Sequence, residues 1–322
     1  MERSRMIPVC LLMMAACGED ETEPAADAQS SDGPTDAADV LDGSSADTEG
    51  SAPVVPLVCE EGVAVRTVEG RVQSPDGAVI SDARGQVCVR SLPGGRLTCL
   101  RPQPVDPEGR FVVTVPADVG CFERVVMRVF DAAAGHAPLY CELPLTAVDG
   151  EQRLVAGEGL TLLPVVDPVD RPEAPADPTQ LSTVTFAGDL RVDIRPSALL
   201  DGAGFYDELR GQRYDPAEVD LCFIPEDAEL WALWGFAPET DVTGENLALT
   251  VPNEWGLEPG DTVSIWLLGG IGTTVGRAGF VDEGDFRAVT RGQVSEDGLI
   301  IRSEQGVPAF TWLGIGPDIA GE

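Results

Sequence analysis

The chain has 322 residues and a formal net charge of −34 at pH 7, and such an acidic surface is a poor partner for nucleic acid and for anionic lipid headgroups. All 21 of its basic residues are Arg, so pyridoxal enzymes, lysine-dependent aldolases and lysine-containing phosphate-binding loops are excluded. It contains 1 His, which excludes histidine-rich metal sites.

Residues 1–16 have the composition of an export signal peptide. Arg3 and Arg5 make the start basic, and the apolar run that follows is too short to cross a bilayer. Met14-Ala15-Ala16-Cys17 resembles the lipobox of bacterial lipoproteins. The resemblance implies that Cys17 becomes the first residue of the mature chain and carries a lipid, which anchors the protein to the bacterial outer membrane or cell surface, on the periplasmic or extracellular face. An ordinary secretory signal is the alternative interpretation.

Residues 17–58 start with this cysteine and continue as an acidic, polar segment. Between Gly18 and Pro53 there are 11 Asp or Glu, with no Arg and no aromatic residue. Such a segment cannot bury enough apolar area to offset the entropy cost of ordering. We therefore expect a disordered acidic stalk.

Residues 59–166 show short Val-rich segments of period two, separated by Gly, Pro and Asp. This spacing is typical of an all-β sandwich. The predicted strands cover residues 63–72, 84–90, 97–101, 111–115, 124–130, 139–143 and 160–165.

Two stretches of this region resemble the carboxypeptidase regulatory-like domain, a transthyretin-like β-sandwich. The first, residues 70–83, has the family's glycine, valine, turn glycine and the alanine before its second strand. The second is Val105-Asp106-Pro107-Glu108-Gly109-Arg110-Phe111, with Val in place of the family's Thr. The resemblance implies a non-catalytic accessory or display module. Asp-Gly pairs also accept the positive φ of tight hairpins, so turns are expected here on physical grounds.

Six cysteines follow Cys17, and an even number of cysteines in an exported chain predicts disulfides. They are Cys59, Cys88, Cys99, Cys121, Cys141 and Cys222. If Pro93 and Gly94 form the tip of a hairpin, Cys88 and Cys99 face each other across it, so this pair is predicted to be bonded.

The other cysteines allow several pairings. Cys121 and Cys141 bracket two predicted strands, which favours a bond between them. Cys59 and Cys222 would then tie two domains together. Other connectivities remain open, because connectivity cannot be deduced from spacing alone.

Residues 167–180 contain four prolines and no hydrophobic period, which predicts a semi-rigid linker. Residues 181–322 again show short apolar runs and hold all five Trp, so we expect a second β-domain. Residues 186–199 are weakly similar to the opening of ZU5-like β-sandwich domains, on the step Pro196-Ser197-Ala198-Leu199. The whole prediction is an all-β fold of two β-sandwich domains behind a signal peptide and a disordered acidic linker.

No motif in the chain points to catalysis. There is no Gly-x-Ser-x-Gly nucleophile motif, and His136 lies in a segment that predicts an exposed turn. A zinc protease would need a second His on the same helix face. A glycosidase with a pair of carboxylates is the enzyme class that the sequence excludes least, although nothing marks such a pair.

Two clusters are candidates for ligand or metal binding. The aromatic run with Trp231, Trp234 and Phe236 is the best candidate for a ligand surface, but both of its faces are apolar, which favours a central strand. Asp282, Glu283 and Asp285 surround a glycine and could offer oxygen ligands to calcium, although acidic clusters also arise by chance in such a chain. No other cofactor is expected.

These observations predict a non-catalytic surface or outer-membrane lipoprotein with an adhesive, scaffolding or ligand-presenting role. A carbohydrate- or peptidoglycan-binding module and an extracytoplasmic hydrolase with a carboxylate pair are the alternatives. The expected partners are the membrane, through the lipid anchor, and an extracytoplasmic protein or glycan.

Overall fold

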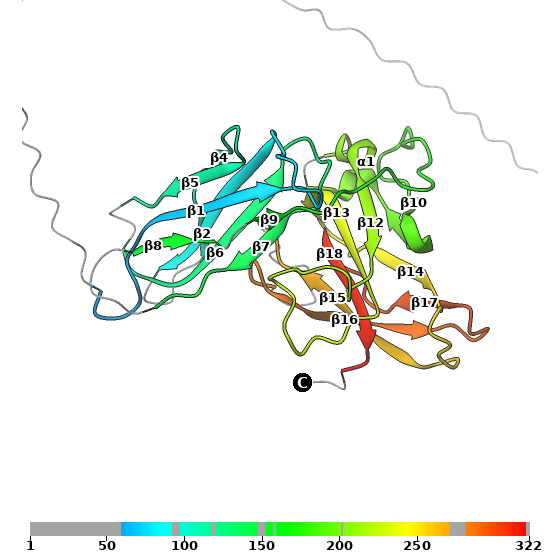
Figure 1. Ribbon diagram of the computed structural model, residues 1–322. Coiled ribbons are helices and arrows are strands. Elements are labelled where there is room, and N and C mark those ends of the chain that lie inside the picture. The colour runs from blue at the N-terminus through cyan, green and yellow to red at the C-terminus, as the bar shows by residue number, and fades with distance from the viewer. Residues whose placement is uncertain are drawn as a thin grey trace, which may run out of the picture. The chain divides into compact units, whose positions relative to one another are not determined.

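The computed structural model describes residues 59–91, 97–116, 120–146, 152–156, 159–200, 202–270 and 281–319 (Figure 1). The predicted signal peptide, Cys17 and the acidic stalk lie outside these residues. From Cys59 onward the described residues belong to one compact unit. The fold is all-β, as the sequence predicts, and no described helix is long and apolar enough to cross a membrane.

Two sheets form the N-terminal part, which we call the N-terminal sandwich. The first sheet has the order β5-β1-β8, with β9 also paired to β1, and the second has the order β3-β2-β6-β7, with β4 paired to β2. The strands are β1 (Val65–Gln73), β2 (Ala83–Ser91), β3 (Leu97–Cys99), β4 (Gln103–Pro104), β5 (Arg110–Thr114), β6 (Phe122–Asp131), β7 (Leu139–Glu142), β8 (Gln152–Val155) and β9 (Leu160–Thr161). Alternate valines of these strands point to the inner side of each sheet, and Val68, Val87 and Val129 are fully buried.

The two sheets of the sandwich approach closely where the ring of Phe111 lies over Gly85. A Cβ atom at Gly85 would lie 2.2 Å from Cδ2 of Phe111, and one at Gly70 would lie 2.7 Å from the same ring. Glycine is therefore required at Gly85, because a side chain there would displace the largest residue of β5.

The C-terminal part is one nine-stranded sheet, which we call the C-terminal sheet. Its order is β10-β11-β14-β17-β16-β15-β18-β13-β12. The strands are β10 (Ser182–Thr185), β11 (Arg191–Ile194), β12 (Arg210–Tyr214), β13 (Ala232–Asp241), β14 (Ala248–Pro252), β15 (Thr262–Leu268), β16 (Phe286–Val294), β17 (Ile300–Ser303) and β18 (Ala309–Pro317). The short helices η1 (Ala187–Asp189), η2 (Pro196–Ala198) and α1 (Phe205–Glu208) lie in its connections.

The C-terminal sheet curls so that its first strands pack across its last ones. Phe186, directly after β10, has its ring 5.1 Å from that of Phe236 in β13 and 6.1 Å from that of Phe310 in β18. These aromatic residues are the centre of a hydrophobic core enclosed by the sheet itself.

The opposite face of the C-terminal sheet packs against the N-terminal sandwich. Leu233, Trp266 and Trp312 belong to the same buried cluster as the valines of the sandwich. Trp234, next to Leu233, points instead into the core of the C-terminal sheet. This explains why the sequence around β13 is apolar on both faces, since β13 lies between β12 and β18 and separates two cores.

Residues 167–180 run from the sandwich to the C-terminal sheet without a helix or strand of their own. Arg171 donates a hydrogen bond from Nη1 to the carbonyl oxygen of Leu209 (2.9 Å), and the Tyr206 hydroxyl donates to that of Pro172 (3.0 Å). These bonds hold the segment against the C-terminal sheet.

Candidate functional site

All six described cysteines form disulfides: Cys59–Cys121, Cys88–Cys99 and Cys141–Cys222. The predicted Cys88–Cys99 bond is confirmed, because β2 and β3 pair in the expected register. Leu100 N–H donates to the Val87 carbonyl, so Cys88 and Cys99 occupy a narrow, non-hydrogen-bonded position of the ladder.

The predicted bonds Cys121–Cys141 and Cys59–Cys222 are wrong. Cys141 lies opposite Met127 in the pairing of β6 with β7, so it is displaced along the sheet from Cys121, which directly precedes β6. A bridge between Val63 and Phe122 brings Cys59 to Cys121 instead.

The central strand that the apolar run favours is confirmed as β13, so the alternative of a ligand surface at Trp231, Trp234 and Phe236 is not supported. Trp234 and Phe236 are buried, at 1% and 3% exposure. Trp231 packs against Trp255, with ring centroids 5.4 Å apart. Because β13 lies between two cores, Trp234 and Phe236 stabilise the fold from inside it, whereas Trp231, just before the strand, is half-buried.

The calcium candidates Asp282, Glu283 and Asp285 do not converge on one point within the described residues. Asp282 pairs with Arg90 of β2 at 2.8 Å, and Asp285 pairs with Arg124 of β6. These ion pairs hold the two flanking carboxylates apart, so the structure does not support the predicted calcium site.

His136 is not the exposed turn residue that its sequence context predicts. Its Nδ1 atom lies 2.8 Å from Oδ2 of Asp131, and its side chain is 21% exposed. Asp131 also accepts hydrogen bonds from the backbone N–H groups of Ala133 and Gly135. The pair therefore fixes the turn that joins β6 to β7.

A groove with a volume of about 1120 Å³ lies on the outer face of the sheet formed by β5, β1 and β8. Two rows of side chains cross this face. In one row, Glu69 of β1 lies between Val112 of β5 and Val155 of β8. The two valines are 50% and 67% exposed, so the groove offers apolar surface on both sides of a carboxylate.

In the second row, Arg71 of β1 lies directly opposite Arg110 of β5. Like charges opposite each other on neighbouring strands destabilise a sheet unless something neutralises them. Arg110 is neutralised by Asp106 and Glu108, at 2.9 and 3.2 Å. Arg71 uses Nε to donate to the carbonyl of Glu108 (3.1 Å) and makes no ion pair with any residue that the structure describes.

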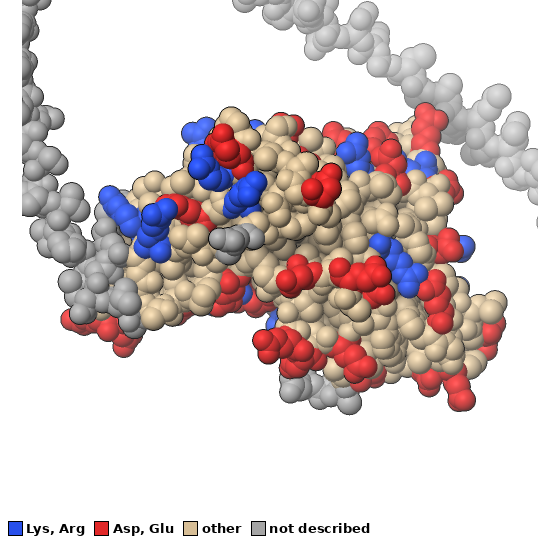
Figure 2. All heavy atoms as spheres, in the orientation of Figure 1, with Lys and Arg blue, Asp and Glu red and all other residues tan. Residues whose placement is uncertain are grey.

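Basic side chains gather over this sheet, whereas acidic side chains dominate the surface over the C-terminal sheet in the same view (Figure 2). Arg153 of β8 adds a further positive charge and pairs with Glu69. At the groove the three arginines are thus balanced by Glu69, Asp106 and Glu108, which makes it a locally neutral surface on a strongly acidic protein.

A second polar cluster is buried where the sandwich meets the C-terminal sheet. Arg128 of β6 pairs with Glu239 of β13 at 3.1 Å and donates from Nη1 to Gln86 at 2.8 Å. The Tyr140 hydroxyl donates to Glu239 at 2.7 Å. Burial, together with the charge of Glu239, raises the pKa of Tyr140 well above its ordinary value, so the phenol stays protonated and keeps this hydrogen bond.

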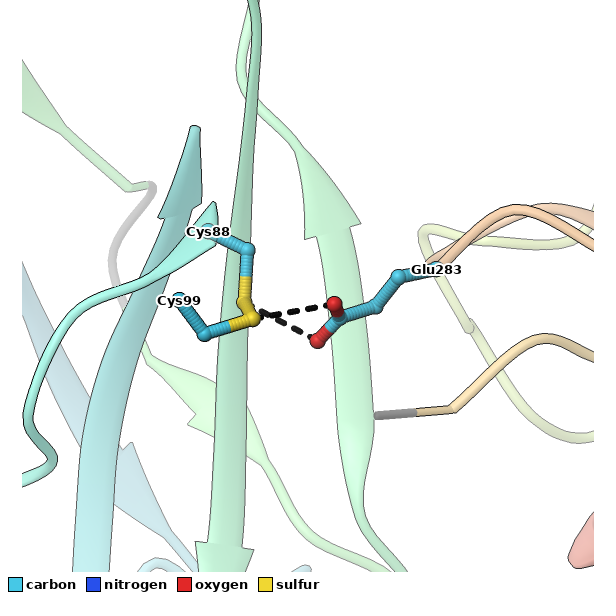
Figure 3. Close-up of side chains that lie close together, drawn as sticks. All are labelled: Cys88, Cys99 and Glu283. Carbon is cyan, nitrogen blue, oxygen red and sulfur yellow. Dashed lines mark hydrogen bonds between the residues drawn. A yellow bond between two sulfur atoms is a disulfide. The ribbon is translucent and has the colours of Figure 1, made fainter. Parts of the chain in front are cut away.

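Glu283 extends this cluster to the Cys88–Cys99 disulfide (Figure 3). One of its carboxyl oxygens lies 2.9 Å from Sγ of Cys88 and the other lies 2.9 Å from Sγ of Cys99. Burial, with a further contribution from Glu239, raises the pKa of Glu283 to about 7. The two sulfurs are bonded to each other, so they are not thiolate ligands for a metal.

Sequence reasoning missed the roles of Arg71 and Glu283. Arg71 lies in the resemblance to the carboxypeptidase regulatory-like domain, but only strand pairing places it beside Arg110. The sequence places Glu283 among acidic neighbours, whereas its partner Cys88 lies 195 residues away along the chain. Comparisons of this chain with known protein families, with curated protein sequences and with solved structures find no match.

Proposed function

We propose that the protein is an exported lipoprotein that is anchored through Cys17 to the bacterial outer membrane or cell surface. The basic start, the apolar run and the lipobox-like residues before Cys17 support this proposal. The three disulfides support it as well, because disulfides persist in oxidising compartments outside the cytosol.

Its role is to bind a partner without catalysis, through the groove over β5, β1 and β8. The observation that carries this proposal is the exposed guanidinium of Arg71, which has no ion pair among the described residues although the chain has a net charge of −34. A guanidinium binds a carboxylate in a bidentate manner, with geometry as well as charge.

The ligand is an extended acidic peptide segment of a partner protein. Strand β8 ends the order of its sheet, and an edge strand presents backbone groups with which an extended segment can pair. In an extended segment alternate side chains share one face, so residues i and i+2 of the segment can face the groove together, an acidic one beside Arg71 and an apolar one beside Val112 and Val155.

The experiment compares two fluorescent peptides on the full chain, a Val-Glu peptide with the repeat Ser-Val-Ser-Glu and a Val-Lys peptide with the repeat Ser-Val-Ser-Lys, so that Val and the charged residue share one face of the extended peptide. We expect the Val-Glu peptide to bind more tightly, with an affinity that falls as salt is added. Arg71→Ala should weaken its binding by about tenfold or more, since a hydrogen-bonded charge is removed. Arg191→Ala is the matched control, because Arg191 is an exposed strand arginine of the C-terminal sheet.

Equal binding of the two peptides, or Val-Glu binding that Arg71→Ala leaves unchanged, would contradict the proposal. Polygalacturonate is tested in parallel, as a carboxylate polymer without a peptide backbone. If it binds in an Arg71-dependent manner and the Val-Glu peptide does not, the groove is a glycan site and the peptide assignment is wrong.

A further inference from the structure

The carboxyl group of Glu283 is held against both sulfurs of one disulfide by the loop that joins β15 to β16. The neighbours of Glu283 fix this loop, since Asp282 is paired with Arg90 and Asp285 with Arg124. Gly284 adopts φ +81°, a conformation that glycine permits, and its N–H donates to the carbonyl of Gly269 at 2.8 Å. The position of Glu283 is thus set by contacts with the sandwich strands on both sides.

The hydrogen in these contacts must come from the carboxyl group. A disulfide sulfur carries no hydrogen and can only accept, so an ionised Glu283 would place its negative oxygens against sulfur lone pairs. A neutral Glu283 can donate to one sulfur. If the disulfide is reduced, two S–H groups face the same two oxygens, and they stabilise the ionised carboxylate by hydrogen bonding.

We propose that Cys88, Cys99 and Glu283 form a proton-coupled redox site, in which thiol–disulfide exchange at Cys88–Cys99 is assisted by proton transfer from Glu283. This activity is separate from ligand binding in the groove.

The surroundings of Glu283 favour a neutral carboxyl that can still ionise. Glu239 of β13 raises the pKa of Glu283, whereas Arg128 and Arg124 of β6 lower it, and burial is the largest influence. Tyr140 of β7 also interacts electrostatically with Glu283. The resulting pKa of about 7 lies near that of an ordinary thiol, which suits proton transfer between the two groups.

The two sulfurs differ in access. Cys99 lies on β3 at the end of its sheet and is partly exposed, whereas Cys88 is fully buried. A thiolate of an external dithiol therefore attacks Sγ of Cys99. The new bond joins the dithiol to Cys99, the Cys88–Cys99 bond breaks, and Cys88 leaves as a thiolate.

Glu283 completes this step, because its carboxyl proton passes to the Cys88 thiolate 2.9 Å away and leaves a carboxylate. The second thiol of the reductant then attacks its own sulfur in the mixed disulfide and closes to a cyclic disulfide. Cys99 departs as a thiolate and takes its proton from solvent. Two electrons pass from the dithiol, which is oxidised, to Cys88 and Cys99, which are reduced.

The test is reduction of the full chain by dithiothreitol over a range of pH, with alkylation and peptide mapping to follow each disulfide separately. Rates are divided by the thiolate fraction of the reductant, because the thiolate is the nucleophile. For Cys88–Cys99 we expect the corrected rate to fall about tenfold between one pH unit below and one above the pKa of Glu283. Cys59–Cys121 and Cys141–Cys222 are internal controls and should show no such fall.

Glu283→Gln keeps a hydrogen-bond donor beside the sulfurs but cannot transfer a proton, so its corrected rate should be lower and independent of pH. Glu245→Gln, an exposed acid paired with Arg195, is the matched control. Infrared difference spectra of the unaltered chain give a second readout, namely loss of a protonated carboxyl band when the disulfide is reduced below neutral pH. A corrected wild-type rate without pH dependence, or reduction without loss of that band, would overturn the proposal.

Discussion

Trp312 in β18 donates its indole N–H to the backbone carbonyl of Pro138 across 2.5 Å, and both groups are buried. Trp312 belongs to the C-terminal sheet and Pro138 to the N-terminal sandwich. The indole is part of the core that the sheet and the sandwich share. The disulfide Cys141–Cys222 joins the same two parts a few residues away. The sandwich is therefore completed by side chains that come from the other end of the chain.

The first prediction follows from this shared core. Trp312→Phe should lower the free energy of unfolding by about 1 to 3 kcal/mol, because it leaves the Pro138 carbonyl buried without its donor. Trp312→Ala should cost about 3 to 5 kcal/mol. Urea unfolding followed by tryptophan fluorescence and by circular dichroism should show one transition for both parts. Trp231→Phe, at a half-buried position, is the control, and two separate transitions would show that the parts fold independently.

The second prediction concerns the close approach of Phe111 to Gly85. Gly85→Ala should destabilise the fold by about 1 to 3 kcal/mol, since the new methyl group forces the aromatic ring to move. Gly204→Ala is the control, because nothing lies within 4 Å of a Cβ atom there and its φ is −62°. In a Phe111→Leu background the cost of Gly85→Ala should shrink, and equal costs in both backgrounds would contradict the close approach.

The third prediction is a pH dependence of stability that arises from Glu283. Burial raises its pKa from 4.5 to about 7, so the neutral form is favoured in the folded state. The neutral carboxyl stabilises the folded state by up to about 3 kcal/mol. This stabilisation is fully present below the pKa of Glu283 in the unfolded chain and is lost as the pH rises through its pKa in the folded protein.

Glu283→Gln has no such titration, so its stability relative to the wild type should improve between about pH 5 and about pH 8. Urea unfolding of both proteins at several pH values measures this difference with the disulfides intact. Glu245→Gln should show no comparable trend, and a constant difference for Glu283→Gln at all pH values would contradict the burial of an ionisable carboxyl.

The fourth prediction concerns the lipid anchor. Cys17→Ser should either release the protein from the cell envelope or leave it unprocessed, because stable anchoring needs the acyl chains that the cysteine would carry. Cell fractionation and intact-mass measurement detect both outcomes. A processed, membrane-bound Cys17→Ser protein would contradict lipidation, and Ser44→Ala is a control within the same segment.

The sequence allowed the local parts of this fold to be predicted. The pairing register of β2 with β3, and hence the Cys88–Cys99 pair, is predicted correctly, because a hairpin between neighbouring segments fixes the register of both strands. Strand β8 was not predicted. It is four residues long and pairs in parallel with β1, which lies about 80 residues earlier in the chain. Because no short turn joins the two strands and β8 is too short to show a clear pattern, the sequence does not indicate this pairing.

The candidate sites needed the tertiary structure for the same reason. In sequence, Glu283 is one of several neighbouring acidic residues. It differs from them because its side chain is largely buried and contacts the sulfurs of Cys88 in β2 and Cys99 in β3. Arg71 resembles any other exposed arginine until β5 places Arg110 opposite. In both cases the chemical character depends on residues from distant strands.

The parallel addition of β8 to β1, and the contribution of Trp312 to the core of the sandwich, also constrain how the chain folds as it is made. A nascent chain emerges with its N-terminus first, so β1 appears long before β8 and β18 exist. Until then its strand edge and its valine face lack their final neighbours, and such late, long-range contacts make folding slow and aggregation-prone. The core of the sandwich can therefore close only after nearly the whole chain has been synthesised.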